Sequence, residues 1–196
     1  MPHYFEEQPA TPSAPVTVAV RLPDVHLDLM SDRGVFSRSA LDPGTKLLLL
    51  EAPSPPPHGN LLDLGCGWGP IAVTLARRAP GARVWAVDVN RRALAVTAEN
   101  ANRAEVTNVV VASPDDVPAD ISFAAIYSNP PVRVGKRALH EMLLRWMARL
   151  APRGSAHLVV QRNLGADSLA RWLSEQGFAT DRIASRLGYR LLTVTP

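Results

Sequence analysis

Apolar and polar residues alternate in two adjacent runs near the start of the chain. Residues 16–22 and 25–29 carry an apolar side chain at every second position, and Pro23-Asp24 between them is typical of a turn. This alternation predicts two strands that each bury one face, so we predict a β-hairpin. Asp42 and Pro43 then predict the start of a helix, because Asp can cap a helix and Pro suits its first position.

From residue 60 onward the pattern changes to short apolar strands that alternate with amphipathic helices. Strands are predicted at 61–64, 83–87, 109–112, 123–127, 156–160 and 190–194, and helices at 70–79, 90–103, 136–150 and 167–176. Asn90 can cap the second of these helices. Such alternation predicts an α/β fold, with a mostly parallel sheet that helices cover on both faces. We expect one domain over 1–196, with an arm, hairpin and helix in 1–59 and a Rossmann-like core in 60–196.

The composition narrows the class of protein further. The chain has 196 residues, 46% hydrophobic and 20% charged, which is typical of a globular domain. Its longest apolar run, 47–50, is too short to cross a bilayer, and its first ten residues lack the apolar core of a signal peptide. The single Cys66 excludes an intramolecular disulfide and suits a reducing compartment. We therefore predict a cytoplasmic protein, and the net charge of +3 permits a polyanionic partner.

A glycine-rich turn follows the strand predicted at 61–64. Gly65, Gly67 and Gly69 lie within five residues, and glycines let a backbone approach a ligand that a Cβ would repel. The dinucleotide pattern Gly-x-Gly-x-x-Gly fails because residue 70 is Pro. Asp63 at the entrance of the turn would repel a pyrophosphate but suits an ammonium group. S-adenosylmethionine carries that ammonium and no phosphate, so it is the predicted cofactor in preference to NAD.

Further polar residues follow the next two predicted strands. Asp88 ends the strand at 83–87, where a carboxylate can accept hydrogen bonds from both ribose hydroxyls. Taken alone, Asp63 as a turn former and Asp88 as a helix cap would be competitive interpretations. Ser113 or Asp115, after the third strand, can accept from the adenine amino group or simply form a polar turn. The predicted cofactor-binding residues are Asp63, Gly65, Cys66, Gly67, Asp88, Val89, Ser113, Asp115 and Asn129.

The fourth predicted strand of the core runs into Asn129-Pro130-Pro131. A proline forces the residue before it into an extended conformation, which stiffens Asn129 and Pro130. The side-chain oxygen of Asn129 and the carbonyl of Pro130 can then accept from the two N–H donors of an exocyclic amino group. In-line methyl transfer to that nitrogen depends on positioning and electrostatics more than on a strong base. We predict Asn129, Pro130 and Pro131 as the catalytic residues.

These motifs together resemble the class I methyltransferases. Within that class the chain is similar to the single-domain form of the ribosomal-RNA small-subunit guanine-N2 methyltransferase C family. The resemblance rests on five segments: Gly34 to Ser37, Asp42 to Thr45, Asp63 to Pro70, Ser128 to Pro131, and Arg133 to Lys136. It implies a seven-stranded sheet with one reversed strand, S-adenosylmethionine as cofactor, and guanine N2 of small-subunit ribosomal RNA as the acceptor.

One position departs from the pattern of many amino methyltransferases, which place an aromatic residue directly after Asn-Pro-Pro. Here that residue is Val132, so base stacking falls to another side chain, and Phe36 or Tyr4-Phe5 is the candidate. Arg133 and Lys136 follow the motif and can contact phosphates, although a charged helix start explains them nearly as well. The predicted substrate-binding residues are Phe36, Val132, Arg133 and Lys136.

Three other functions stay open at this point. The chain can methylate a small metabolite or a protein, serve as a non-catalytic RNA-binding or assembly module that keeps the cofactor pocket, or be an NAD oxidoreductase. A metal site is not expected, because the five histidines are scattered and have no helical i, i+4 pair. Cys66 is better explained as a small residue in a tight turn than as a nucleophile.

Overall fold

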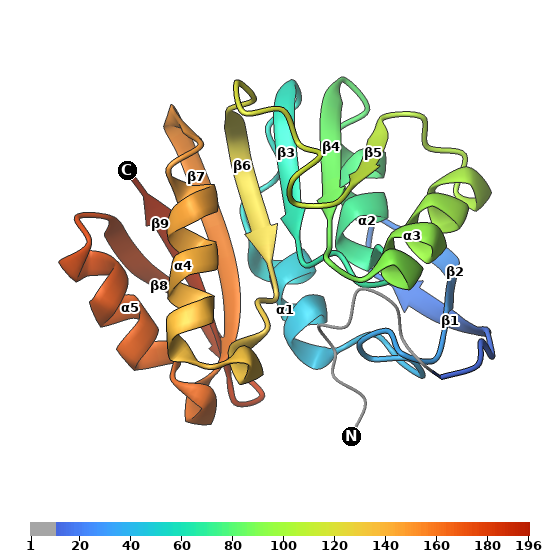
Figure 1. Cartoon of the computed structure of the whole chain (residues 1–196), viewed down its shortest axis with the longest axis horizontal. Helices are drawn as coiled ribbons and strands as arrows, with labels where there is room; N and C mark the ends of the chain where they lie inside the picture. Colours follow the sequence, from blue (N-terminus) through green and yellow to red (C-terminus); the bar gives the residue numbers. More distant parts are fainter. Residues whose placement is uncertain (1–10) are drawn as a thin grey trace.

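The computed structural model describes residues 11–196, apart from the side chain of Arg133. A seven-stranded sheet forms its centre, in the order β5-β4-β3-β6-β7-β9-β8 (Figure 1). The strands are β3 (Gly59–Leu64), β4 (Ala82–Val87), β5 (Val109–Ala112), β6 (Phe123–Ser128), β7 (Leu150–Gln161), β8 (Ala179–Arg186) and β9 (Tyr189–Thr195).

The sheet is mostly parallel, as predicted. β3 pairs in parallel with β4 and β6, β4 with β5, and β6 with β7. β9 pairs antiparallel with both β7 and β8, so it is the single reversed strand. The fold class inferred from the sequence is therefore confirmed.

Helices cover both faces of the sheet. They are α1 (Pro43–Glu51), α2 (Pro70–Arg78), α3 (Arg91–Arg103), α4 (Lys136–Met147) and α5 (Ala166–Glu175), with short 3-10 turns at Val132–Val134 and Arg162–Leu164. Neighbouring residues of a strand face opposite sides. Leu61 thus belongs to a core that contains residues of α1 and α2, whereas Leu62 packs in a second core with residues of α4 and α5 (Figure 1).

The predicted hairpin is present and is fixed to the rest of the chain. β1 (Val16–Arg21) and β2 (His26–Ser31) pair antiparallel and pack with the core that contains α1 and α2. The Asn100 side chain on α3 accepts from the Met30 amide at 2.7 Å and donates to the carbonyls of Met30 and Trp68. One buried amide thereby connects the hairpin, α3 and the glycine-rich turn.

Three elements differ from the predictions: α4 is shorter than predicted, β7 begins at Leu150 instead of 156, and β8 was not predicted. α4 ends at Met147 instead of 150, because Leu150 pairs with Phe123 and begins β7. Leu150 lies three residues after Met147, which is the spacing of residues on one face of a helix. The apolar pattern alone therefore extended the predicted helix to Leu150. No strand was predicted at β8. That strand lies at the sheet edge, is largely exposed, and carries a register shift between Arg182 and Ala184 that interrupts alternation.

Both predicted helix caps are confirmed. The Asp42 side chain accepts from the amides of Gly44 and Thr45, and the Asn90 side chain accepts from those of Arg92 and Ala93. These caps place the starts of α1 and α3 beside the carboxyl ends of the parallel strands, where the predicted motifs also lie. Within residues 11–196 no helix is long and apolar enough to cross a membrane.

Candidate active site

The glycine-rich turn leaves an open space above the end of β3. The amides of Gly65 and Cys66 both donate to the Val87 carbonyl at the end of β4, at 2.8 and 3.0 Å. Gly65 has φ 77°, and a Cβ added there would meet no atom within 4 Å. The turn therefore exposes backbone to a ligand-sized space, which is the geometry expected of a cofactor cradle.

Asp63 lies beneath this turn and is fully buried. Its Oδ2 accepts from the Ala72 amide in the first turn of α2 at 2.9 Å, while its Oδ1 has no hydrogen-bond partner among the described residues. Burial raises the pKa of this carboxyl to about 8. Asp63 lines none of the three cavities described below.

Asp88 follows β4 and holds the turn from the other side. Its Oδ2 accepts from the Gly67 amide at 2.9 Å, and its Oδ1 accepts from the Asn90 amide at 2.9 Å. Burial raises its pKa above the ordinary value, an effect that the backbone donors oppose. A carboxylate oxygen can accept more than one hydrogen bond, so both oxygens of Asp88 remain able to accept from a hydroxyl.

A cavity of about 370 Å³ opens next to Asp88, beyond the ends of β3 and β4. Its walls are largely apolar and include Val89, Pro114, Val134 and Met142. The predicted adenine acceptors are engaged elsewhere, since Ser113 Oγ donates to Asp116 at 2.6 Å and Asp115 pairs with Arg145 at 2.8 Å. We refer to this space as the Asp88 cavity.

A second cavity of about 350 Å³ lies beyond the ends of β6 and β7. Pro130, Pro131 and Val132 line it, together with three residues that the sequence did not single out: Gln161, Leu164 and Tyr189. Gln161 ends β7 and pairs with Tyr189, the first residue of the reversed strand β9. A chain reversal thus brings residues from two distant segments to one place, and neither segment carries a local motif. We refer to this space as the Pro131 cavity.

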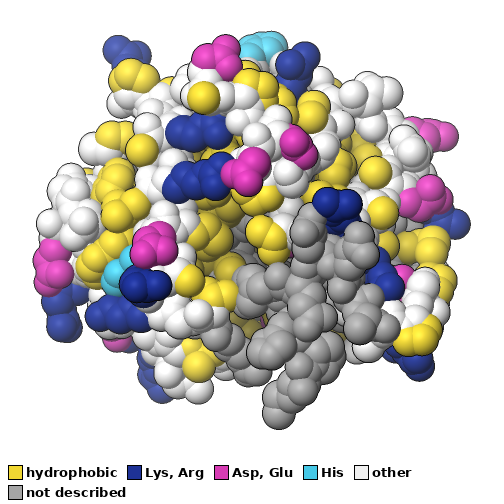
Figure 2. All heavy atoms as spheres, in the orientation of Figure 1, with side chains coloured by type: hydrophobic (Ala, Val, Ile, Leu, Met, Phe, Trp, Pro, Cys, Tyr) yellow, Lys and Arg dark blue, Asp and Glu magenta, His cyan; other side chains and the backbone are white. Residues whose placement is uncertain are grey.

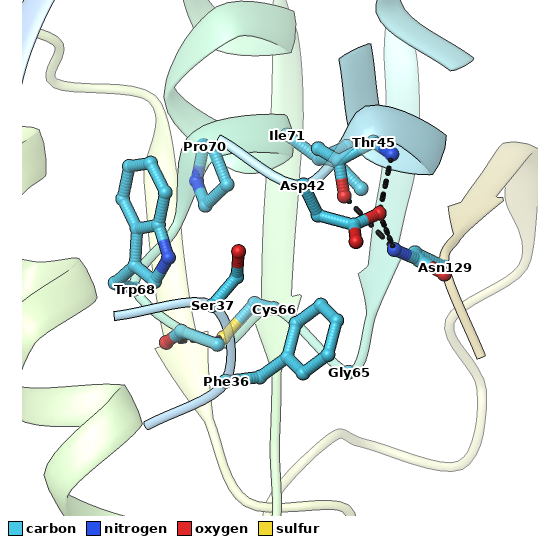
Figure 3. Close-up of a pocket in the computed structure, with 11 residues that line it drawn as sticks. Phe36, Ser37, Asp42, Thr45, Gly65, Cys66, Trp68, Pro70, Ile71 and Asn129 are labelled. Carbon is cyan, nitrogen blue, oxygen red and sulfur yellow. Dashed lines mark hydrogen bonds between the residues drawn. The ribbon is translucent and has the colours of Figure 1, made fainter. Parts of the chain in front are cut away.

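A narrow recess lies between the turn and the Pro131 cavity. Ser37, Thr45, Cys66 and Trp68 line it, and Phe36, Asp42 and Asn129 line both the recess and the Pro131 cavity (Figure 3). Trp68 is almost fully buried, and burial raises the pKa of the Cys66 thiol. The thiol is therefore protonated, and this favours a packing role over a nucleophilic one.

Asn129 lies between the recess and the Pro131 cavity. Its Nδ2 donates to Asp42 Oδ1 at 2.8 Å and to Thr45 Oγ1 at 3.0 Å, and in the described part of the chain no group donates to its Oδ1. The Pro130 carbonyl accepts from the Val132 amide at 2.8 Å and keeps a second lone pair. Two acceptors thus adjoin a cavity that is large enough for a planar ring.

Comparison with known families identifies the chain. A model of the methyltransferase small domain family matches residues 26–193. The chain belongs to this family. It is a methyltransferase, and the predictions of its class and of its cofactor, S-adenosylmethionine, are confirmed at the level of the family and a solved relative.

Two kinds of relative are similar in sequence to this methyltransferase. The uncharacterized protein YbxB of Bacillus subtilis (strain 168) is 33% identical over 193 residues, covering 97% of this chain and 96% of its own. The ribosomal RNA small subunit methyltransferase C of Aeromonas hydrophila is 37% identical over 130 residues, covering 64% of this chain. The chain spans only 36% of that relative's length.

A solved structure is similar to this chain over nearly its whole length. A 16S rRNA N2 methyltransferase of T. thermophilus, in complex with AdoMet and guanosine, has a TM-score of 0.79 and 25% identity. It covers 94% of this chain, which in turn spans 51% of that protein. A ribosomal protein L11 methylase of Lactobacillus delbrueckii, at 22% identity and a TM-score of 0.64, shares the fold.

The remaining predicted residues of this methyltransferase lie at the rim or outside the described part. Val89 and Phe36 are about two-fifths exposed, at 41% and 44%, and each lines a cavity. Lys136 is exposed at the start of α4, and Tyr4-Phe5 lies outside the described residues. Among those described, no three His, Cys, Asp or Glu side chains form a group that would hold a metal ion.

Basic side chains do not form one continuous patch on the described part of the face in Figure 2. Lys and Arg side chains there are scattered among acidic ones and border a strip of apolar atoms. Arg145 illustrates the pattern, because it lines the Asp88 cavity and is paired with Asp115. Long-range attraction of a polyanion by this face is therefore modest.

Proposed function

We propose that this methyltransferase transfers a methyl group to an exocyclic amino group, and that the acceptor is guanine N2 of small-subunit ribosomal RNA. The observation that carries the proposal is the arrangement around Asn129. Its Nδ2 donates to Asp42 and Thr45, and no group in residues 11–196 donates to its Oδ1 at the border between the recess and the Pro131 cavity. An acceptor in this place suits the N–H groups of an amine.

The cofactor is S-adenosylmethionine, and the site has features that fit each part of it. The Asp88 carboxylate suits the ribose hydroxyls, and the apolar Val89, Pro114 and Met142 suit the adenine ring. The open space at Gly65 admits the methionine portion, and Asp63 Oδ1, which has no hydrogen-bond partner within residues 11–196, provides a negative or polar group behind it. When bound, the cofactor supplies an electrophilic methyl group on a sulfonium.

The acceptor nitrogen is held by two oxygen atoms of the Asn-Pro-Pro segment. Asn129 Oδ1 and the Pro130 carbonyl accept its two N–H donors, and this turns the nitrogen lone pair toward the recess. Positioning of this kind accelerates an in-line transfer without a strong base. The partly apolar walls of the Pro131 cavity lower the polarity around these groups, which strengthens both hydrogen bonds.

Base stacking falls to Phe36 in this proposal. Val132 lines the Pro131 cavity but has no aromatic ring. Phe36, in the segment between β2 and α1, lines the same cavity and is 44% exposed. Arg133 and Lys136 follow Val132 in sequence and are the candidates for contacts with phosphates on either side of the base.

The ribosomal assignment is supported by the relatives whose names include small-subunit ribosomal RNA and by the solved complex with guanosine. The test is to incubate small ribosomal particles from cells that lack this protein with labelled S-adenosylmethionine and the purified chain. We expect label in N2-methylguanosine of the RNA. Label confined to protein or to a metabolite would support the alternative acceptors, and unchanged RNA would contradict the ribosomal assignment.

A further inference from the structure

The side-chain amide of Asn129 has two ends of nearly equal shape and opposite chemistry. If the amide rotates by half a turn, its NH₂ group replaces Oδ1 at the Pro131 cavity. An amino acceptor would then face a donor instead of an acceptor, and its N–H groups would lose a partner. The proposed function therefore requires that something fixes which end of the amide faces the cavity.

Asp42, which caps α1, and Thr45, in the first turn of α1, face the nitrogen end of this amide. Asp42 Oδ1 lies 2.8 Å from Asn129 Nδ2, and Thr45 Oγ1 lies 3.0 Å from the same nitrogen. Figure 3 shows both contacts converging on one side of Asn129. An ionised carboxylate only accepts hydrogen bonds, so the rotated amide would bring two unprotonated oxygens together at hydrogen-bond distance. The chemistry of Asp42 thus decides the orientation.

Asp42 is itself held rigidly. Its Oδ1 also accepts from the amides of Gly44 at 2.8 Å and Thr45 at 3.0 Å, which cap the start of α1. Its Oδ2 lies 3.4 Å from the Tyr189 hydroxyl. A Cβ on Gly44 would come within 2.6 Å of the Tyr189 ring, so only glycine permits this close packing. The helix start, and not a flexible loop, sets the position of the carboxylate.

We propose that Asp42 and Thr45 are positioning residues that orient the Asn129 amide, so that Oδ1 faces the Pro131 cavity. This inference rests on the proposed amine methylation, because orientation matters only if Asn129 accepts from the substrate. It extends that proposal by giving the segment Asp42 to Thr45 a role in the reaction, beyond its role in starting a helix.

The cleanest test removes one anchor and leaves the helix cap intact. Thr45→Val deletes the hydroxyl and keeps the shape, while Asp42 still caps α1. We expect kcat to fall about fivefold to tenfold. The KM for ribosomal particles and the affinity for S-adenosylhomocysteine, measured by calorimetry, should change little. Thr45→Ser should restore most of the kcat, because it returns the hydroxyl.

Thr74→Val is the matched control. Thr74 is a fully buried threonine of α2 whose hydroxyl has no hydrogen-bond partner among the described residues. The same chemical change there should leave kcat unaltered. An equal loss in Thr74→Val and Thr45→Val, or a Thr45→Ser variant as impaired as Thr45→Val, would overturn the proposal.

A second measurement does not depend on knowing the acceptor. The side-chain amide protons of Asn129 can be observed by NMR after assignment with Asn129→Ala. We expect them to exchange with water more slowly than those of the exposed Asn163, and to exchange faster in Thr45→Val but not in Thr74→Val. Fast exchange in the unaltered protein overturns the inference, even where Thr45→Val does not fold. Failure of the ribosomal assignment, in contrast, appears as unlabelled RNA with a protected Asn129 amide.

Discussion

The Asp88 cavity and the Pro131 cavity lie at the same edge of one sheet but are built in different ways. The first is lined on one side by the ends of β3 and β4, where the glycine turn and Asp88 lie, and on the other by α4 and the short turn before it. The second is assembled from the segment before α1, the segment after β6, and the antiparallel pair β7 and β9.

The two constructions correspond to two kinds of recognition. The Gly67 amide donates to the Asp88 carboxylate, and the Gly65 and Cys66 amides donate to the Val87 carbonyl, so the strand-end side of the first cavity relies on main-chain geometry that a short motif encodes. The second depends on side chains that meet only after folding, such as Asp42 with Asn129 and with Tyr189. A shared cofactor suits the first arrangement, and a specific acceptor suits the second. Substitutions should therefore separate cofactor binding from transfer.

The largest separation is expected for Asn129→Ala. The change removes the acceptor Oδ1 while leaving Asp42 and the glycine turn in place, so methyl transfer should fall by roughly two to three orders of magnitude. Binding of S-adenosylhomocysteine, measured by calorimetry, should stay within about threefold, since one neutral contact is at stake. Transfer that persists at near the normal rate would place the reaction elsewhere in the molecule.

The opposite pattern is expected for Asp88→Ala. The carboxylate lines its cavity and also accepts from Gly67 and Asn90, so its loss should weaken cofactor affinity roughly 10- to 100-fold. With saturating cofactor, transfer should recover most of its rate, because nothing in the Pro131 cavity has changed. A control is Asp28→Ala, which removes an exposed carboxylate that pairs with Arg21 on the hairpin; neither residue lines the cavity, so the affinity should be unaltered.

A smaller effect is expected on the acceptor side for Phe36→Ala. Stacking of a base on an aromatic ring contributes roughly 1–3 kcal/mol, so kcat/KM for the RNA should fall about 5- to 100-fold. Phe36→Tyr keeps the ring and should behave as the unaltered protein, whereas Phe36→Leu keeps only apolar area. If the leucine variant matches the tyrosine variant in steady-state kinetics, Phe36 contributes packing and not stacking.

The same contrast, between features that a local motif encodes and contacts that form only after folding, explains which elements could be predicted from the sequence. The strands and helices around the cofactor turn were predicted to within a residue or two, because apolar periods and the caps at Asp42 and Asn90 mark them locally. Strand β8 was missed, since its largely exposed edge position and its irregular pairing remove the alternating signal.

Within the site, the sequence pointed to Asn129 and the glycine turn but assigned Asp42 only as a helix cap. A side chain that caps a helix carries no mark of a partner 87 residues away. Gln161, Leu164 and Tyr189 had no signal at all, because their meeting depends on the reversal of β9. Ser113 and Asp115 also follow a strand end, but Ser113 donates to the nearby Asp116 and Asp115 pairs with Arg145 on α4, and neither partner could be read from the local pattern.

The smallest effect is expected from the ionisation of Asp63, which tests whether this carboxyl takes part in cofactor binding. Its pKa is raised from 3.8 to about 8, so between these values the folded chain binds a proton that the unfolded chain has released. The free energy of unfolding should then decrease as the pH rises through this window, at no more than about 1.4 kcal/mol per pH unit, and level off above it.

Asp63→Asn cannot titrate and should remove this slope in denaturation experiments. Burial lowers the pKa of His157 to about 4, and that group changes stability in the opposite direction below pH 6.5, but it is present in both proteins and cancels in the comparison. Saturating S-adenosylhomocysteine, whose ammonium favours the ionised carboxylate, should flatten the slope of the unaltered protein alone. A slope that the ligand leaves unchanged would mean that Asp63 holds only α2, and that the turn itself supplies all the recognition on this side.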